Sequence, residues 1–97
     1  MTLEFHPGVA SDISQIVTYY QEAGGRQLAD EFLAELRSCF NRAAEAPRAY
    51  ARQDGDLQRV NLDRFPYHFL FRVVDNRVRV LVVRHHRRSP TMGSVRR

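Results

Sequence analysis

The stretch Tyr67–His85, with the sequence YHFLFRVVDNRVRVLVVRH, decides the fold of this chain. It consists of two runs rich in valine and aromatic residues, which favour β-strands, and the runs are separated by Asp75-Asn76. Acidic and amide side chains at both central positions are typical of a two-residue hairpin turn. The stretch therefore predicts an antiparallel β-hairpin with strands Tyr67–Val74 and Arg77–His85.

A two-residue turn fixes how the two strands pair. It places Phe71 opposite Val80, so that one face of the hairpin is apolar and can receive helices. On the other face it places Arg72 opposite Arg79. Like charges in this position are unfavourable unless an anionic group lies between them.

The same register describes the end of the hairpin that lies away from the turn. It places Tyr67 opposite Arg84, on one face together with His86, whereas His68 shares the other face with His85. Because successive strand residues point to opposite faces, His85 and His86 cannot easily bind one metal ion. No other His or Cys stands at a metal-ligand spacing, so neither a metal site nor a cofactor is predicted.

The segments before the hairpin predict helices and further strands. Apolar residues recur at helical spacing over 9–20 and again over 26–46, with Gly24-Gly25 between the two segments. Residues 3–5 predict a short strand, and residues 57–62 predict another. The expected fold is α+β: an N-terminal strand, an antiparallel two-helix hairpin, then three antiparallel strands forming a small sheet with the helices on one face. It forms a single domain over residues 1–97, with 91–97 as a flexible tail.

Charge is distributed unevenly along the chain. The net charge is +4, but residues 1–47 contain three arginines and seven acidic residues, and residues 48–97 contain twelve arginines and four acidic residues. A basic half indicates an anionic partner without deciding among RNA, DNA and an acidic protein segment. The single cysteine, Cys39, excludes an internal disulfide, and no apolar stretch approaches the ~20 residues that span a bilayer. We therefore expect a cytoplasmic protein that does not associate with membranes.

Catalysis by a serine or cysteine nucleophile is not indicated, because no serine stands in a Gly-x-Ser-x-Gly context and Cys39 lies on an apolar helix face. Metal-independent cleavage of RNA stays open. A histidine such as His68 or His86 can transfer a proton near neutral pH, and arginines can stabilise charge on a reacting phosphate. The alternative is that these histidines only end the strands of the sheet.

Four motifs, in this order, resemble one family of proteins. They are His6-Pro7, Tyr19-Tyr20, Phe65-Pro66-Tyr67 and His85-His86-Arg87-Arg88-Ser89-Pro90. Together with the two helical segments they resemble the RelE/ParE superfamily of bacterial type II toxin-antitoxin toxins over residues 3–90. The resemblance implies a growth-inhibiting toxin that is neutralised in a heteromeric complex by an acidic, partly disordered cognate antitoxin, which folds on binding.

The superfamily divides by target, and the fold alone does not identify the target. RelE-like members cut mRNA in the ribosomal A site, whereas ParE-like members inhibit DNA gyrase without cutting RNA. Where RelE-like ribonucleases have two basic residues before the corner, this chain has Arg59 and Asn61, and His68 stands where they have an arginine. Arg88 matches a basic residue after their last strand. No tyrosine follows Tyr67 to match their C-terminal catalytic tyrosine.

The resemblance gives three sets of candidate residues. The catalytic candidates of a ribonuclease would be Arg59, His68, Arg84, His86 and Arg88. The ending HHRRSP is closer to the His-Gly-Arg-Arg-Asp-Pro ending of ParE-like chains, which favours a gyrase inhibitor that is not an enzyme. The target-binding candidates are then Tyr67, Arg84, His86, Arg87 and Arg88. The antitoxin-binding candidates are Arg72, Arg79, Leu81 and Val83. A basic binding module or an inactive toxin is the remaining alternative.

Overall fold

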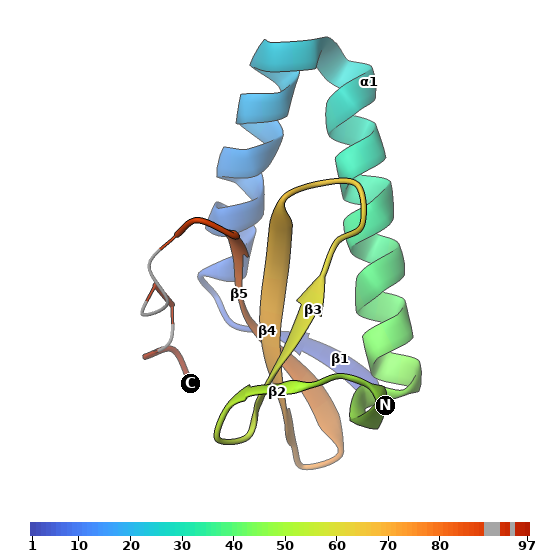
Figure 1. The fold of residues 1–97 in the computed structure, drawn as a ribbon, viewed down its shortest axis with the longest axis vertical. Coiled ribbons are helices and arrows are strands. Elements are labelled where there is room, and N and C mark those ends of the chain that lie inside the picture. The colour runs from blue at the N-terminus through green and yellow to red at the C-terminus, as the bar shows by residue number, and fades with distance from the viewer. Residues whose placement is uncertain (89–91, 94) are drawn as a thin grey trace.

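In a computed structural model, which describes residues 1–88, 92–93 and 95–97, helical segments pack on one face of a five-stranded mixed sheet (Figure 1). The strands lie in the order β1-β5-β4-β3-β2 across the sheet. Along the chain the elements are β1 (Thr2–Phe5), α1 (Val9–Glu45), the 3-10 helix η1 (Pro47–Ala49), β2 (Arg52–Asp54), β3 (Leu57–Asn61), β4 (Tyr67–Val74) and β5 (Arg77–His85).

The prediction of two separate helices is wrong, because Val9–Glu45 forms one helix, α1. Within it Gly25 departs from helical angles, with φ 82° and ψ −179°. This backbone conformation is accessible to glycine because glycine has no Cβ atom. Figure 1 shows α1 bending at its far end, so that its second half runs back beside its first half. The predicted break is therefore a kink within α1, at Gly25, where its two helical halves meet.

The prediction of a three-stranded antiparallel sheet is also wrong. β1 joins the sheet by pairing with β5 in parallel, from Thr2 opposite Arg77 to Phe5 opposite Val80. β2 adds a fifth strand beside β3. Its three residues are all exposed, so an alternation of apolar and polar residues could not mark it in the sequence.

The predicted hairpin is confirmed next to its turn. Asp75 and Asn76 both have positive φ, of 50° and 60°, as a type I′ turn requires. Arg72 pairs with Arg79 as expected. Beyond Phe71, however, a bulge adds one residue to β5, and the predicted register is wrong by one position from there on.

The core between α1 and the sheet is rich in aromatic side chains and fixes the chain corner before β4. Phe65, in that corner, packs edge-on against Tyr20 and Phe32, with ring centroids 5.1 and 5.4 Å apart. The Glu35 carboxylate accepts a hydrogen bond of 2.6 Å from the backbone N–H of Asp63. These contacts hold the start of β4 against α1.

Candidate functional site

The bulge in β5 divides the predicted site residues between the two faces of the sheet. Tyr67 pairs with His85, and His68 pairs with Arg84, whereas the sequence predicted that Tyr67 lies opposite Arg84. Two clusters result at this end of β4 and β5. We call them the tyrosine pocket, formed by Tyr19, Tyr67, His85 and Arg88, and the histidine cluster, formed by Arg59, His68, Arg84 and His86.

The tyrosine pocket lies where the first half of α1 meets the end of the sheet. Two adjoining hollows, of about 220 and 360 Å³, share its four residues in their walls. The ring of Tyr67 meets that of His85 edge-on, with centroids 5.0 Å apart. Tyr19 is 59% exposed, while Arg88 is exposed at the rim. The pocket is therefore open to a macromolecular partner.

The phenol of Tyr67 and the guanidinium of Arg88 give the tyrosine pocket hydrogen-bond donors. Burial raises the pKa of Tyr67, nearby Tyr19 raises it further, and the Arg88 guanidinium opposes this rise. Behind Tyr67, burial raises the pKa of Tyr20 to about 12. Both buried phenols thus keep their protons at neutral pH. Phenols and a guanidinium suit the binding of acceptor groups such as carboxylates and carbonyls.

The histidine cluster is a chain of hydrogen bonds on the opposite face. Arg84 Nε donates to His68 Nε2 at 2.9 Å, and His68 Nδ1 lies 3.0 Å from His86 Nδ1. Because a guanidinium can only donate, His68 Nε2 must accept, and the proton of the neutral ring is on Nδ1. His68 therefore donates to His86. Arg59 Nη2 also approaches His86 Nδ1, at 3.4 Å.

His68 is poorly suited to proton transfer. Its side chain is 2% exposed, and burial, assisted by the charges of Arg59 and Arg84, lowers its pKa to about 3. Both of its ring nitrogens are already occupied by hydrogen bonds. His86 is exposed, and burial of part of its ring together with Arg59 lowers its pKa as well. The histidine cluster is neutral at its centre and positively charged at its arginines.

The structure does not bring the five target-binding candidates together. Tyr67 and Arg88 lie in the tyrosine pocket, whereas His86 lies in the histidine cluster. Arg84 belongs to the histidine cluster and also lines the smaller hollow. Arg87 is exposed, and its backbone N–H donates to His85 Nδ1 at 3.0 Å. Ser89 and Pro90, which end the motif, lie outside the described residues.

Sequence reasoning missed two residues of the tyrosine pocket. Tyr19 lies in the first helical segment but outside its apolar face, and it is 59% exposed. An aromatic residue on the polar face of a helix is a signal in the sequence that could have identified it. His85 was assigned to the wrong face, because the bulge reverses the alternation of β5.

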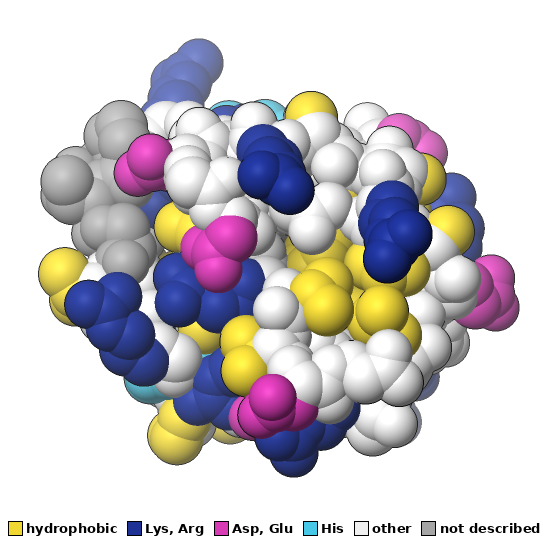
Figure 2. Space-filling view, turned by 90° about the horizontal axis from the view of Figure 1, so that it is seen from below, with side chains coloured by type: hydrophobic (Ala, Val, Ile, Leu, Met, Phe, Trp, Pro, Cys, Tyr) yellow, Lys and Arg dark blue, Asp and Glu magenta, His cyan; other side chains and the backbone are white. Residues whose placement is uncertain are grey.

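Among the antitoxin-binding candidates, Arg72 and Arg79 already have acidic neighbours from their own chain. Arg79 forms an ion pair with Glu4, and Arg72 lies 3.7 Å from Asp56. Figure 2 likewise shows arginine side chains next to acidic ones at this end of the molecule. The anionic groups that the facing arginines require are thus supplied within the chain.

Leu81 and Val83, the other antitoxin-binding candidates, are each 1% exposed. Val83 pairs with Phe69 and lies in the core, so its predicted place on the outer face is wrong. The bulge in β5 is again the cause.

Within residues 1–88, 92–93 and 95–97, no group of three or more His, Cys, Asp or Glu side chains could hold a metal ion. In the same part of the chain, no helix is long and apolar enough to cross a membrane.

Comparisons with known proteins agree with this fold. Toxin ParE2 of Mycobacterium tuberculosis (strains ATCC 25618 / H37Rv and CDC 1551 / Oshkosh) is 27% identical over 88 residues, which cover 91% of this chain and 84% of the relative. The structure of the chromosomal ParDE TA system from P. aeruginosa matches with a TM-score of 0.78 at 18% identity, over 88% of this chain and 95% of that one. The isolated E. coli RelE toxin matches with a TM-score of 0.59 at 19% identity, over 96% and 92%. These two structural matches show a shared fold.

The sequence itself decides the family. The model of the family described as "ParE toxin of type II toxin-antitoxin system, parDE" matches residues 3–90, which is most of the chain. The chain therefore belongs to the ParE toxin family of type II toxin-antitoxin systems.

Proposed function

We propose that this toxin acts by binding DNA gyrase through the tyrosine pocket and does not cut RNA. The observation that supports this most is the state of His68. It stands where RelE-like ribonucleases have a basic residue, but it is buried, neutral and hydrogen-bonded at both ring nitrogens. A group that cannot reach a substrate cannot serve as its acid or base.

The tyrosine pocket offers a binding surface in place of a catalytic one. Its exposed Tyr19 and Arg88 combine aromatic area with a planar cation, and both residue types are frequent where interfaces bind most strongly. The hydrogen-bond donors of the pocket, the Tyr67 phenol and the Arg88 guanidinium, favour a target surface with acidic side chains or free carbonyl groups. Such a surface is more consistent with inhibition of a protein than with bond cleavage.

Inhibition of purified gyrase by the Arg88→Gln variant tests this proposal. Loss of one charge-assisted hydrogen bond should raise the toxin concentration that halves DNA supercoiling by roughly tenfold. Arg26→Gln is the matched control, because the Arg26 side chain is 90% exposed near the kink in α1 and lines neither hollow of the pocket. Equal inhibition by both variants would exclude the tyrosine pocket as the gyrase-binding surface.

A second candidate function is ribosome-dependent cleavage of mRNA. It is favoured by the convergence of Arg59 and Arg84 on the exposed His86 through hydrogen bonds and the intervening His68. Toe-printing of mRNA on ribosomes is the test. We expect no toxin-dependent stops in the reading frame. Toxin-dependent toe-print stops that are lost with the His86→Gln variant would contradict the gyrase proposal and support the ribonuclease function.

The family implies a cognate antitoxin, and we propose that its acidic residues contact Arg72 and Arg79. The side chains of Arg72 and Arg79 are 19% and 22% exposed, so both guanidinium groups are partly accessible to a partner. A carboxylate from the antitoxin competes there with Asp56, which lies 3.7 Å from Arg72, and with Glu4, which pairs with Arg79. Charge reversal at both arginines should weaken antitoxin binding, and unchanged affinity would place the antitoxin elsewhere.

A further inference from the structure

One edge of β5 is left without a neighbouring strand. β1 pairs with β5 from Arg77 to Val80, and its last ladder bond runs from the backbone N–H of His6 to Val80 O at 2.8 Å. Beyond that point, among the residues that the structure describes, no strand pairs with this side of β5. Unpaired strand edges are sites where an extended chain can add to a sheet.

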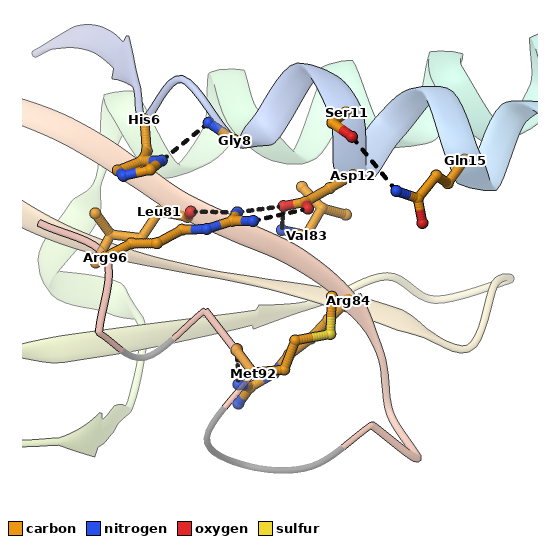
Figure 3. Close-up of polar contacts among 10 residues, drawn as sticks. All are labelled: His6, Gly8, Ser11, Asp12, Gln15, Leu81, Val83, Arg84, Met92 and Arg96. Carbon is orange, nitrogen blue, oxygen red and sulfur yellow. Dashed lines mark hydrogen bonds and ion pairs between the residues drawn. The ribbon is translucent and has the colours of Figure 1, made fainter.

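A pair of side chains takes the place of the missing strand (Figure 3). Arg96 Nη1 donates to the carbonyl oxygen of Leu81 at 3.0 Å, and the backbone N–H of Val83 donates to Asp12 Oδ2 at 3.1 Å. Arg96 and Asp12 also bind each other, through hydrogen bonds of 2.7 and 3.2 Å. Their side chains therefore satisfy the donor and acceptor that a neighbouring strand would satisfy.

Arg96 belongs to a C-terminal segment that lies along β5. We call the described residues of this segment, 92–93 and 95–97, the strap. Arg84 Nη1 donates to Met92 O at 2.6 Å, and Arg79 Nε donates to Arg97 O at 2.9 Å. Gly93 passes so close to Val82 that a Cβ atom on it would lie 2.6 Å from Val82 Cγ2. The strap thus contacts β5 at several points along its length.

The strap lies outside the part of the chain that defines the family. The family match ends at residue 90, and the strap begins at Met92. The β5 edge at Leu81 and Val83 and the Asp12 side chain therefore lie within the matched residues, and the strap lies beyond them.

We propose that the β5 edge at Leu81 and Val83, together with Asp12, is a docking site for an extended peptide segment containing an arginine, and that the strap is its built-in occupant. The strap shows what the site accepts. The guanidinium of Arg96 binds Asp12 and the carbonyl oxygen of Leu81. A glycine, Gly93, passes close to Val82. Two backbone carbonyls of the strap accept hydrogen bonds from Arg79 and Arg84.

The burial of Asp12 makes the cation a requirement. The Asp12 side chain is 5% exposed, and a carboxylate in such a place is costly unless a charge and hydrogen bonds compensate it. A guanidinium can bind both carboxylate oxygens while also reaching a backbone carbonyl, which an ammonium group does less well. A partner must therefore supply a guanidinium group and displace the strap. Competition with the strap excludes partners that bind weakly. The site is independent of whether gyrase is the target of the toxin.

Two variants of the full-length chain open the site in different ways. Arg96→Gln removes the guanidinium, and Gly93→Val places a side chain against Val82 at a position where φ is 76°. Arg97→Gln is the matched control. It makes the same change of charge one residue further on, where Arg79 donates to the backbone carbonyl of Arg97 and not to its side chain. Arg96→Gln removes a charge, whereas Gly93→Val creates a steric clash. If one of these variants does not fold, the other still tests the proposal.

The probe is the hexapeptide MGSVRR, which repeats residues 92–97, added to each isotope-labelled chain while its amide signals are followed by NMR. We expect it to bind both opened variants about tenfold more tightly than the wild-type chain or Arg97→Gln, and to shift the Val83 amide signal. The peptide MGSVQR should lose this binding. Equal affinity for all four chains, or shifts confined to surfaces away from Val83, would overturn the proposal.

Discussion

At the scale of single residues, His68 shows how burial changes what a side chain can do. An imidazole beside arginines suggests acid–base chemistry when only its neighbours in the sequence are known. In the fold, Arg84 donates to one ring nitrogen and the other faces His86, while burial lowers the pKa of His68 to about 3. The ring then serves to join two strands and to satisfy a buried guanidinium.

The depressed pKa of His68 predicts how stability depends on pH. In the unfolded chain the imidazole binds a proton below pH ~6.5, whereas in the folded chain it stays neutral down to about pH 3. Between these values the unfolded state binds more protons, so the free energy of unfolding falls as pH falls, by roughly 1 kcal/mol per pH unit from this group.

Urea unfolding of the wild-type chain and His68→Gln at several pH values between about 4 and 6 measures this effect. Glutamine can accept from Arg84 and donate to His86 without titrating. The variant should therefore show a shallower loss of stability on acidification. The same slope in both chains would mean that His68 is protonated in the folded state.

At the scale of the elements, the kink in α1 depends on one glycine. Gly25 has φ 82° and ψ −179°, a combination that residues with a Cβ atom strongly disfavour. Nothing lies within 4 Å of a Cβ atom built on Gly25, so the cost of a substitution there is conformational and not steric. Because the kink turns the second half of α1 back along the first, it also places Phe32 and Glu35 against the corner before β4.

Gly25→Ala should destabilise the fold by about 1–3 kcal/mol, the usual cost of forcing an L residue into such a conformation. Thermal or urea unfolding measures it, and Glu22→Ala, an exposed change in the same helix, is the control. The control should change stability by less than about 0.5 kcal/mol. If Gly25→Ala changes the free energy of unfolding as little as the control does, α1 does not depend on this backbone conformation.

The elements also show how far the sequence could predict the fold and the site. Asp75-Asn76 fixed the hairpin turn and the pairing of Arg72 with Arg79 correctly, because turn chemistry is local. The bulge could not be predicted, since it falls in the run Val80–Val83, which is apolar at every position and has no alternation to mark an extra residue. That single position decided which face received His85, and with it the composition of the tyrosine pocket.

At the scale of the whole molecule, part of the uneven charge of the chain is neutralised within the fold. Acidic residues of the first half pair with arginines of the second: Glu4 with Arg79, Asp12 with Arg96, and Glu31 with Arg64. A basic second half therefore does not by itself require an anionic partner. The charge asymmetry of the sequence partly reflects contacts between segments that are distant along the chain.

Among these pairs, Asp12 and Arg96 should contribute most to stability, because their side chains are only 5% and 23% exposed. Arg96→Gln leaves a buried carboxylate without its cation and should lower the free energy of unfolding by about 2 kcal/mol. Arg97→Gln should change it by less than about 0.5 kcal/mol. Urea unfolding of the two variants distinguishes them, and equal stabilities would show that the strap contributes nothing to the fold.

We propose that the toxin stops DNA replication by binding gyrase through the tyrosine pocket and not by cutting RNA. Its most direct measurement is the incorporation of labelled thymidine and labelled methionine in the minutes after toxin expression in bacteria without the antitoxin. Thymidine incorporation should fall first while methionine incorporation continues, and Arg88→Gln should weaken this effect. An early fall in methionine incorporation with intact DNA synthesis would contradict it.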